Sequence, residues 1–368
     1  MNQPSHLRAT QTVILLLNLG TPSAPTRQAV RTYLQEFLSD PRVVEIPKLV
    51  WWFLLNLIIL PIRSGTSAKK YASIWLGDLG SPLLHYSRLQ AHALQAKFTR
   101  AEDSIVVELA MRYGQPSMGA VFEKMKAIGT IERLLILPLY PQYSATTSAS
   151  SFDEILRLMS HWRNQPELRI VKHFHDNPAY IGALSHSITL FWRQHGRPNF
   201  AAGERLVMSF HGLPKRNLLL GDPYHCECLK TGRLLGEALD LEPGQYLVTF
   251  QSRFGKAEWL KPYTALTLEA LGAKECPRVD IVCPGFPADC LETLEEIAME
   301  GKILFEEAGG KNYNFIACLN DSPQWIDALM TIAKSHLGGW PMKPETAAEL
   351  NLREQRATLA MTSFGGDN

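Results

Sequence analysis

The chain has 368 residues, of which 37 are Lys or Arg and 36 are Asp or Glu, which gives a net charge of +1. This length predicts two domains or one large one, and the balanced charge gives no support for a nucleic-acid partner. Residues 1–11 are polar and lack the apolar stretch of a secretory signal, so we expect a cytoplasmic protein.

The six cysteines are too few and too scattered for a disulfide framework in a chain of this length, and they fit a reducing compartment. Two of them form the one local cluster, His225-Cys226-Glu227-Cys228. We expect free buried thiols there. A metal or a cluster held by Cys226 and Cys228 is the alternative.

Strand and helix patterns alternate along the chain. Residues 12–19 are a continuous apolar run that ends at Gly20, which is typical of a buried parallel strand, and residues 27–38 have helical spacing. Further strands are expected at residues 105–110, 134–139, 168–173, 205–210, 246–251, 279–283 and 313–319. Further helices are expected at residues 89–98, 117–127, 151–160, 180–194, 230–239, 263–271 and 325–336, and one capped by Asp289 near residues 290–309.

This alternation predicts an α/β protein made of two Rossmann-like domains, each a parallel β-sheet flanked by helices. The polar loop at residues 161–167 divides the chain, so we expect domains at residues 1–165 and 166–342. Residues 343–368 are expected to be a polar tail with little structure. The glycine-rich signatures of nucleotide binding are absent from the sequence.

Residues 49–62 are the most hydrophobic stretch, and we expect them to form a helix that Pro61 stops. About 14 apolar residues are too few to span a bilayer, which takes about 20. An internal helix is one interpretation. Because the stretch is apolar on all sides and is flanked by Lys48 and Arg63, a helix at a membrane surface or at the rim of an apolar pocket is the other.

Two segments carry the candidate chemistry. His211 follows the expected strand at residues 205–210, and Gly212 and Pro214 then end that strand. Strand ends are where α/β sheets place their functional side chains. On the helix after Asp289, the carboxylates of Glu292, Glu296 and Glu300 share one face. A solvated acidic face and a structural histidine are the simpler interpretations, and an inward-facing acidic relay is the functional one.

These two segments resemble the signature segments of the ferrochelatase family, the terminal enzymes of heme synthesis. The resemblance rests on Ser-Phe-His-Gly-Leu-Pro at residues 209–214 with Gly-Asp-Pro-Tyr at 221–224, and on Gly-Phe-Pro-Ala-Asp-Cys-Leu-Glu-Thr-Leu-Glu-Glu at 285–296. It covers residues 12–335 and includes four more motifs in the same order, at residues 17–22, 80–83, 140–144 and 250–255. The resemblance implies the chelatase-type fold.

The resemblance also implies substrate contacts. Positions that match Arg112, Tyr113, Tyr143 and Trp259 border the porphyrin in the family, and residues 49–62 match the hydrophobic lip over the porphyrin. Aromatic side chains after strand ends suit a flat apolar macrocycle. Leu19 and Phe286, which lie within or beside these motifs, complete the expected substrate-binding set.

Iron insertion into a porphyrin requires a group that accepts pyrrole protons and a weak site that delivers Fe²⁺. His211 suits the proton transfer because its ordinary pKa lies near 6.5, and His211, Glu292 and Glu300 are the expected metal ligands. Glu292, Glu296 and Glu300 are the expected acidic relay. Many members of the family have a histidine where this chain has Cys290, which puts in doubt a metal role for that position.

The sequence therefore predicts a ferrochelatase that inserts Fe²⁺ into protoporphyrin IX, with peripheral membrane contact and no tightly bound cofactor. An iron–sulfur cluster is not expected, because the C-terminal Cys-x-x-Cys of cluster-containing members is absent after Cys318. The alternatives are insertion into coproporphyrin III, another metal chelatase, and a non-catalytic porphyrin or heme carrier. A periplasmic-type metal-binding protein with two lobes ranks last, because no signal sequence is evident.

Overall fold

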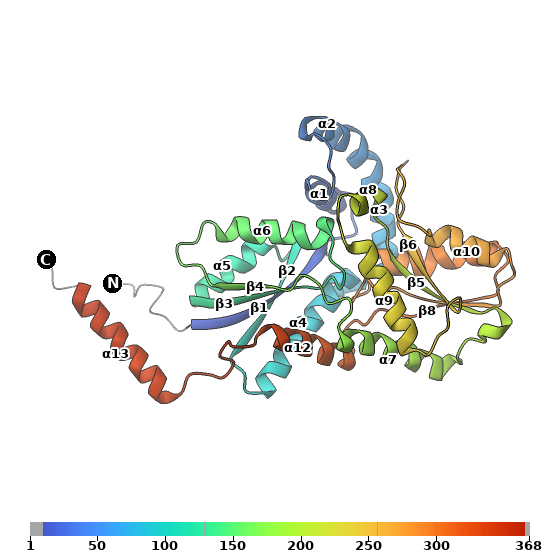
Figure 1. Ribbon diagram of the computed structural model, residues 1–368. Helices are drawn as coiled ribbons and strands as arrows, with labels where there is room; N and C mark the ends of the chain where they lie inside the picture. The colour runs from blue at the N-terminus through green and yellow to red at the C-terminus, as the bar shows by residue number, and fades with distance from the viewer. Residues whose placement is uncertain (1–9, 129, 256, 365–368) are drawn as a thin grey trace.

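The protein is built around two four-stranded parallel sheets (Figure 1). The computed structural model describes residues 10–128, 130–255 and 257–364. The first sheet has the order β2-β1-β3-β4 and the second the order β6-β5-β7-β8. Their strands are β1 (Thr10–Thr21), β2 (Ile105–Gly114), β3 (Thr130–Pro138), β4 (Glu167–Ile170), β5 (Arg205–His211), β6 (Tyr246–Gln251), β7 (Arg278–Val282) and β8 (Asn312–Phe315). The expected α/β architecture is confirmed.

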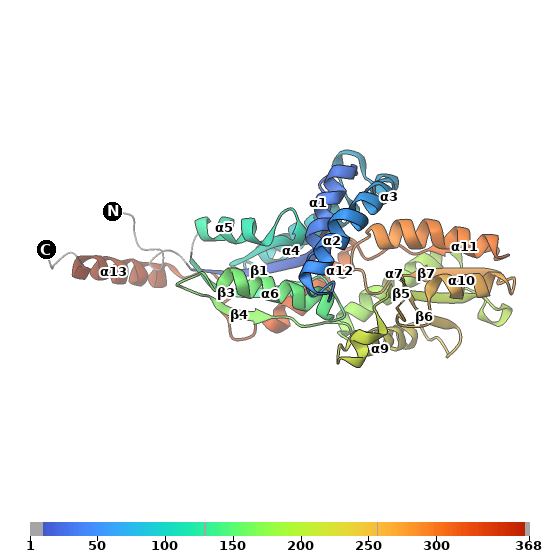
Figure 2. The same ribbon diagram turned by 90° about the horizontal axis from the view of Figure 1, so that it is seen from above.

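Helices cover both faces of each sheet (Figures 1 and 2). The α-helices are α1 (Arg27–Leu38), α2 (Lys48–Leu54), α3 (Leu60–Ile74), α4 (Pro82–Arg100), α5 (Met118–Ile128), α6 (Ser150–Met159), α7 (Pro178–His195), α8 (Lys215–Leu219), α9 (Tyr224–Ala238), α10 (Thr264–Gly272), α11 (Gly301–Glu307), α12 (Pro323–His336) and α13 (Ala347–Phe364). Within the described ranges the π-helices are η2 (Leu55–Ile59), η4 (Ala145–Ala149) and η6 (Glu292–Glu300). Short 3₁₀ turns are η3 (Gly77–Leu79) and η5 (Phe200–Ala202).

Strand β1 is the centre of the first sheet because it pairs with both β2 and β3. Successive side chains of a strand point to opposite faces. Accordingly, Ile14 and Leu16 pack in one hydrophobic cluster, while Val13, Leu15 and Leu17 pack in another. The first of these clusters also contains Leu206, Met208 and Phe210 of β5, so the two sheets share one continuous core.

The boundary expected at residue 165 does not coincide with the division of the sheets. Strand β4 lies just after it, yet pairs with β3 in the first sheet. Near the C-terminal end of the chain, α12 returns to pack against α4 of the first half as well as α7. Strands β4 and β8 also end earlier than expected, so His173 and Cys318 lie in the loops that follow them.

The expectation that Pro61 ends the apolar helix is wrong. Helices α2, η2 and α3 form one continuous helix over Lys48–Ile74. Pro61 is accommodated because the π-helix η2 precedes it, with the N–H of Leu60 bonded to the carbonyl of Leu55 five residues back. A wider turn of this kind relieves the clash that proline causes in an α-helix.

This helix, which we call the lip helix (Lys48–Ile74), stands above the junction of the two sheets (Figures 1 and 2). Over 27 residues it is long and apolar enough to cross a membrane by length and composition, and 17 % of its most apolar window is buried. The 14-residue estimate from the sequence was therefore too short. Core helices of ordinary proteins meet the same test of length and composition, so the low burial is the informative observation.

The expectation of an unstructured tail is also wrong for residues 347–364, which form α13. A capping box begins this helix: the N–H and hydroxyl of Thr346 donate to the Glu349 carboxylate, and the N–H of Glu349 donates to the Thr346 hydroxyl. Such a reciprocal pair satisfies backbone donors at a helix start. Figures 1 and 2 show α13 set apart from the two sheets.

Candidate functional site

His211 is the last residue of β5 and is half-buried. Its Nδ1 lies 2.6 Å from the carbonyl oxygen of Gly212. Because a carbonyl oxygen only accepts hydrogen bonds, Nδ1 carries the proton in the neutral ring and Nε2 keeps its lone pair. The strand end therefore presents a basic nitrogen, which is what a proton acceptor or a metal ligand requires.

Gly212 permits the close approach of β5 and β6 at this point. Its N–H donates to the carbonyl of Gln251 at 2.8 Å, and a Cβ at Gly212 would come within 2.5 Å of that same oxygen. The added Cβ would also lie 3.1 Å from the indole of Trp259. Trp259, an expected substrate contact, thus packs beside the residue that follows His211.

Gln251 joins the end of β5 to the acidic helix. It is the register partner of His211 across the sheet. Its side-chain carbonyl accepts from the Ser209 hydroxyl at 2.8 Å, and its amide nitrogen donates to the backbone carbonyl of Glu292 at 2.7 Å. Sequence reasoning missed this positioning residue, although it lies in one of the motifs that carry the family resemblance.

The acidic segment is the π-helix η6 rather than an α-helix. Its wider turn, with hydrogen bonds from i to i+5, changes which side chains share a partner. Glu296 accepts from the N–H of Ser252 at 2.6 Å and from its hydroxyl at 2.5 Å, so the residue that follows β6 holds this carboxylate. Ser252 reaches it from a left-handed conformation with φ of 64°.

Glu300 is turned toward a different partner from Glu296. Lys70 of α3 donates to Glu295 at 2.8 Å and to Glu300 at 2.7 Å, so the two carboxylates five residues apart share one ammonium group. Burial raises the pKa of Glu295, against the opposing effect of Lys70. The column expected from α-helical spacing is therefore divided between two sets of contacts.

Glu292 faces buried side chains of the first half of the chain. Burial, and then the charge of Glu292, raise the pKa of the Tyr71 hydroxyl. The same two causes raise the pKa of the buried Cys290 thiol, which keeps this thiol protonated near neutral pH. Next to Glu292, Leu291 packs against a hydrophobic cluster of α1 and α3. The acidic helix is thus anchored directly on the lip helix.

Arg112 and Tyr113 are held by a carboxylate that sequence reasoning missed. Asp40 accepts from Arg112 at 2.6 Å, from the Tyr113 hydroxyl at 2.8 Å and from the Ser150 hydroxyl at 2.6 Å. Burial alone would raise the pKa of Asp40, but hydrogen bonds from Ser150, the backbone N–H of Arg42 and Tyr113 lower it. Tyr113 is only 1 % exposed, so its ring belongs to the packing beneath the surface.

The remaining expected contacts are half-buried side chains near strand ends. Leu19 lies near the end of β1, Tyr143 follows β3 and Phe286 follows β7. Because the carboxyl ends of parallel strands meet at one edge of a sheet, these residues lie at the carboxyl-end edges of the two sheets. The ring of Tyr143 is covered by the ammonium group of Lys172, 5.0 Å from the ring centre.

The cysteines of the local cluster do not act together. All six cysteines are free, and Cys226 is exposed whereas Cys228 is buried. The expectation of buried thiols is therefore wrong for Cys226. Residues two apart on a helix face different directions, so α9 separates the two sulfur atoms.

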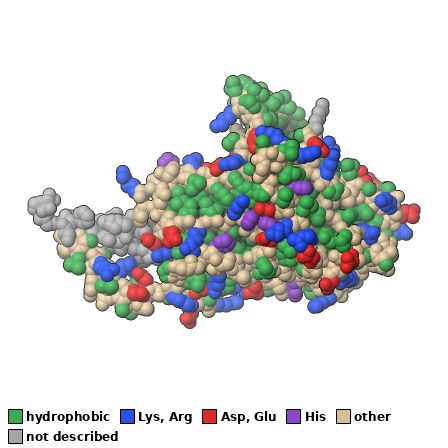
Figure 3. Space-filling model, in the orientation of Figure 1, with side chains coloured by type: hydrophobic (Ala, Val, Ile, Leu, Met, Phe, Trp, Pro, Cys, Tyr) green, Lys and Arg blue, Asp and Glu red, His purple; other side chains and the backbone are tan. Residues whose placement is uncertain are grey.

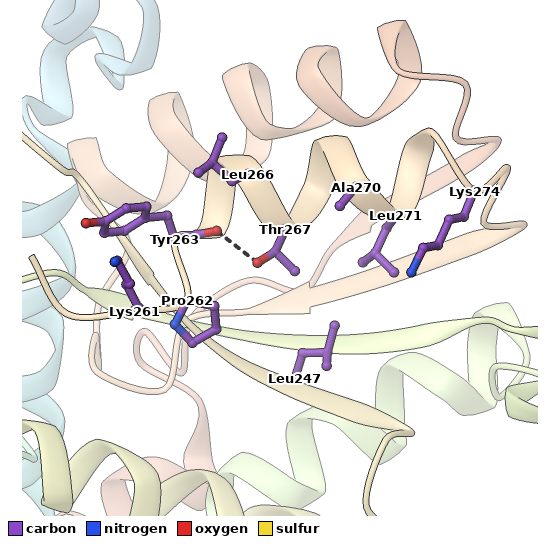
Figure 4. A pocket seen from close by; sticks show the side chains of 9 residues that line it. All are labelled: Leu247, Lys261, Pro262, Tyr263, Leu266, Thr267, Ala270, Leu271 and Lys274. Atoms are coloured by element: carbon purple, nitrogen blue, oxygen red, sulfur yellow. Dashed lines mark hydrogen bonds between the residues drawn. The ribbon is translucent and has the colours of Figure 1, made fainter.

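A surface hollow of about 780 Å³ lies along α10 (Figure 4). Tyr263, Leu266 and Lys274 are among the side chains that line it. Its lining contains no histidine and no carboxylate. It therefore lacks the groups that proton transfer and metal binding need, and the candidate chemistry remains at His211 and η6.

Comparisons with known proteins show the family of this chain. The family profile named Ferrochelatase matches residues 11–337. The ferrochelatase of Herminiimonas arsenicoxydans is 56 % identical over 97 % of this chain and 95 % of its own length. The ferrochelatases of Aromatoleum aromaticum and Chromobacterium violaceum are each 55 % identical, over 95 % and 96 % of this chain and 94 % of their own lengths.

A solved structure shows the same fold at low identity. It is described as SirB from Bacillus subtilis with Fe³⁺, and it aligns with a TM-score of 0.53 and 13 % identity over 91 % of this chain and 100 % of the SirB chain. The sequence relatives show more than the fold, because they are similar to this chain over nearly its whole length. The chain belongs to the ferrochelatase family, lyases of heme biosynthesis that act on iron.

Proposed function

We propose that this protein inserts Fe²⁺ into protoporphyrin IX to form protoheme, with the porphyrin bound beside His211 and beneath the lip helix. The observation that carries the proposal is the junction at Gln251. Its register pairing with His211 and its hydrogen bond to Glu292 connect an imidazole with a free lone pair to the start of an acidic helix. A proton acceptor and a carboxylate are thus held on adjacent elements.

In this proposal the Nε2 lone pair of His211 either accepts a pyrrole proton or binds the entering metal, because one lone pair serves only one of these roles at a time. Glu292 and Glu296 provide negative charge that attracts Fe²⁺ and receives protons leaving the ring. The porphyrin-binding surface is formed or supported by six residues, which are Leu19, Arg112, Tyr113, Tyr143, Trp259 and Phe286. Binding is expected to favour a distorted ring, because only a shape closer to the transition state speeds insertion.

Anaerobic turnover of protoporphyrin IX with Fe²⁺, followed by the heme absorption spectrum, tests this function. Parallel reactions with coproporphyrin III, and with Co²⁺ or Ni²⁺ in place of Fe²⁺, test the nearest alternatives. The apolar lip helix favours protoporphyrin, which has fewer carboxylates than coproporphyrin. Tight porphyrin binding without any metal insertion would indicate a carrier and would overturn the proposal. No resident cofactor is expected, and no iron–sulfur cluster.

Replacing Glu292 by Gln is expected to slow iron insertion by at least about tenfold, because it removes a carboxylate that this proposal assigns to proton transfer and metal binding. Glu306→Gln is the matched control, since the Glu306 side chain lies on α11, is 43 % exposed and is paired with Lys302. The rate of heme formation at saturating porphyrin measures both variants. Equal rates for the two variants would assign no special role to Glu292.

We further propose that the protein is cytoplasmic and that the lip helix gives it peripheral contact with a membrane. Apolar side chains are gathered on the projecting part of the molecule (Figure 3). The most exposed of them include Leu49 at 73 %, Trp52 at 56 % and Leu57 at 66 %. Lys48 and Arg63 flank this surface and would face anionic headgroups.

Charged substitutions on the lip helix are expected to weaken binding to vesicles that contain an anionic phospholipid. Trp52→Asp combined with Leu57→Asp should reduce the bound fraction about tenfold or more, because it removes buried apolar area and adds negative charge. Vesicle flotation measures the binding. Leu266→Asp is the control, since Leu266 is 55 % exposed on α10. Equal losses for lip and control variants would contradict membrane contact through the lip helix.

A further inference from the structure

Three side chains that could bind a metal meet away from His211 and η6. They are His173 and His175, which follow β4, and Glu227 in the first turn of α9. One ligand atom from each lies within 4.8 Å of the others. This set differs from the Cys226 and Cys228 pair that the sequence suggested, because the two histidines follow β4 of the first sheet.

His175 provides the strongest single observation. The residue is only 4 % exposed, and its Nδ1 has no hydrogen-bond partner among the described residues. This atom lies 3.4 Å from a carboxylate oxygen of Glu227, outside hydrogen-bonding geometry. The opposite nitrogen, Nε2, lies 3.9 Å from the carboxylate of Asp176. A buried ring nitrogen without a hydrogen-bond partner therefore lies next to a carboxylate.

His173 completes the group and gives it access to solvent. Its Nδ1 lies 2.6 Å from the other carboxylate oxygen of Glu227, and its side chain is 37 % exposed. Rotation of this exposed ring can bring the three donors to the separations of roughly 3 to 4 Å that surround a bound metal. The proton now on Nδ1 would move to solvent or to Nε2 when the metal binds.

Two lysines near this group, Lys172 and Lys230, contact other partners. Lys230 pairs with Asp176 at 2.5 Å, and the ammonium group of Lys172 lies over the ring of Tyr143. The backbone N–H of Tyr143 in turn donates to Glu227 at 2.7 Å. The carboxylate of Glu227 thus contacts residues in the loops after β3 and β4. A cation bound at this carboxylate would connect these two loops to α9.

We propose that His173, His175 and Glu227 form a second metal site, specific for a divalent first-row transition ion such as Fe²⁺, Co²⁺ or Zn²⁺. Two imidazoles and one carboxylate are donors that suit these ions rather than Mg²⁺ or Ca²⁺. The site is separate from the proposed insertion site, because its ligands come from the loop after β4 and from α9 rather than from β5 and η6. A bound metal would hold Glu227 in place and so stabilise the loop that carries Tyr143, whose N–H donates to this carboxylate.

Titration of metal-free full-length protein with Co²⁺, followed by its visible d–d absorption, tests the proposal. The titration is made in the His211→Ala protein, so that the result does not depend on the proposed insertion site. In this background, His173→Asn and Glu227→Gln are each expected to weaken Co²⁺ binding by at least about tenfold. His186→Asn, which changes an exposed histidine on α7, is the matched control and should bind as the parent does.

Thermal unfolding with and without metal separates lost binding from lost folding. The parent should melt at a higher temperature when Co²⁺ is present, because the ion binds the native state. His173→Asn should melt as the parent does without metal and should lose the metal-induced increase. Co²⁺ affinity that is unchanged in both His173→Asn and Glu227→Gln, or reduced equally in His186→Asn, would overturn the proposal.

Discussion

Replacing His211 by Ala is expected to lower kcat for iron insertion by about 10²- to 10⁴-fold, which is the usual effect of removing a general acid or base. The reason is structural. The carbonyl of Gly212 fixes the proton on Nδ1, so Nε2 is the nitrogen left to accept a proton or a metal ion. Porphyrin affinity should change little, because the imidazole is one polar group at an extended apolar surface. Anaerobic heme formation gives kcat, and quenching of porphyrin fluorescence gives affinity.

His225→Ala is the matched control for this experiment. His225 is also half-buried, its ring lies 5.4 Å from that of Phe250, and burial lowers its pKa. It stands on α9 rather than at a strand end, so its removal should leave kcat nearly unchanged. A comparable loss in both variants would mean that disturbed packing, rather than proton transfer at His211, limits the reaction.

The fold was largely predictable because its strongest signals are local. Strand β1 is a long apolar run, and the five residues from Val13 to Leu17 have no exposed surface. A strand buried on both faces has this pattern and requires parallel neighbours with helices on each side. The alternation of strands and helices then implies two sheets, although sequence alone does not reveal that one core runs through both.

The arrangement of the acidic residues was not predictable from spacing, because η6 is a π-helix. Spacing of four residues implies one face in an α-helix, whereas the structure pairs Glu295 and Glu300 with Lys70 and Glu296 with Ser252. A π-helix is stabilised by tertiary contacts and has no clear local signal. Here the contacts come from α3 and from the residue that follows β6, more than 200 and about 40 residues away in the sequence.

Contacts between distant segments also explain why Asp40 and the group of His173, His175 and Glu227 were missed. Asp40 joins Arg112 only through folding, across 72 residues, and Glu227 joins His173 across 54 residues. The start of α13, in contrast, could have been predicted, since Thr346 and Glu349 have the spacing of a capping box. Polar composition outweighed this signal in the interpretation of the tail.

Gly20→Ala is expected to be the most destabilising of the substitutions considered, lowering the free energy of unfolding by about 4 kcal/mol or more. Gly20 has φ of 110°, and an added Cβ would lie 1.7 Å from the carbonyl oxygen of Tyr113. This oxygen belongs to the paired strand β2, so it cannot move away without breaking the sheet. The Gly20 carbonyl also accepts the Tyr33 hydroxyl at 3.1 Å, which ties α1 to the same point.

Gly244→Ala is the control that separates the cost of backbone strain from the cost of the steric clash at Gly20. Gly244 has φ of 90° but no atom within 4 Å of an added Cβ, so the substitution should cost only about 1 to 2 kcal/mol. Urea unfolding followed by circular dichroism measures both variants. Equal losses would show that strain alone matters and that β1 and β2 can separate at Gly20. The predicted difference follows from the close approach that places Gly20 opposite Tyr113. Gly20 lies between Leu19 and the end of β1, so this close approach is also a condition of the proposed porphyrin site.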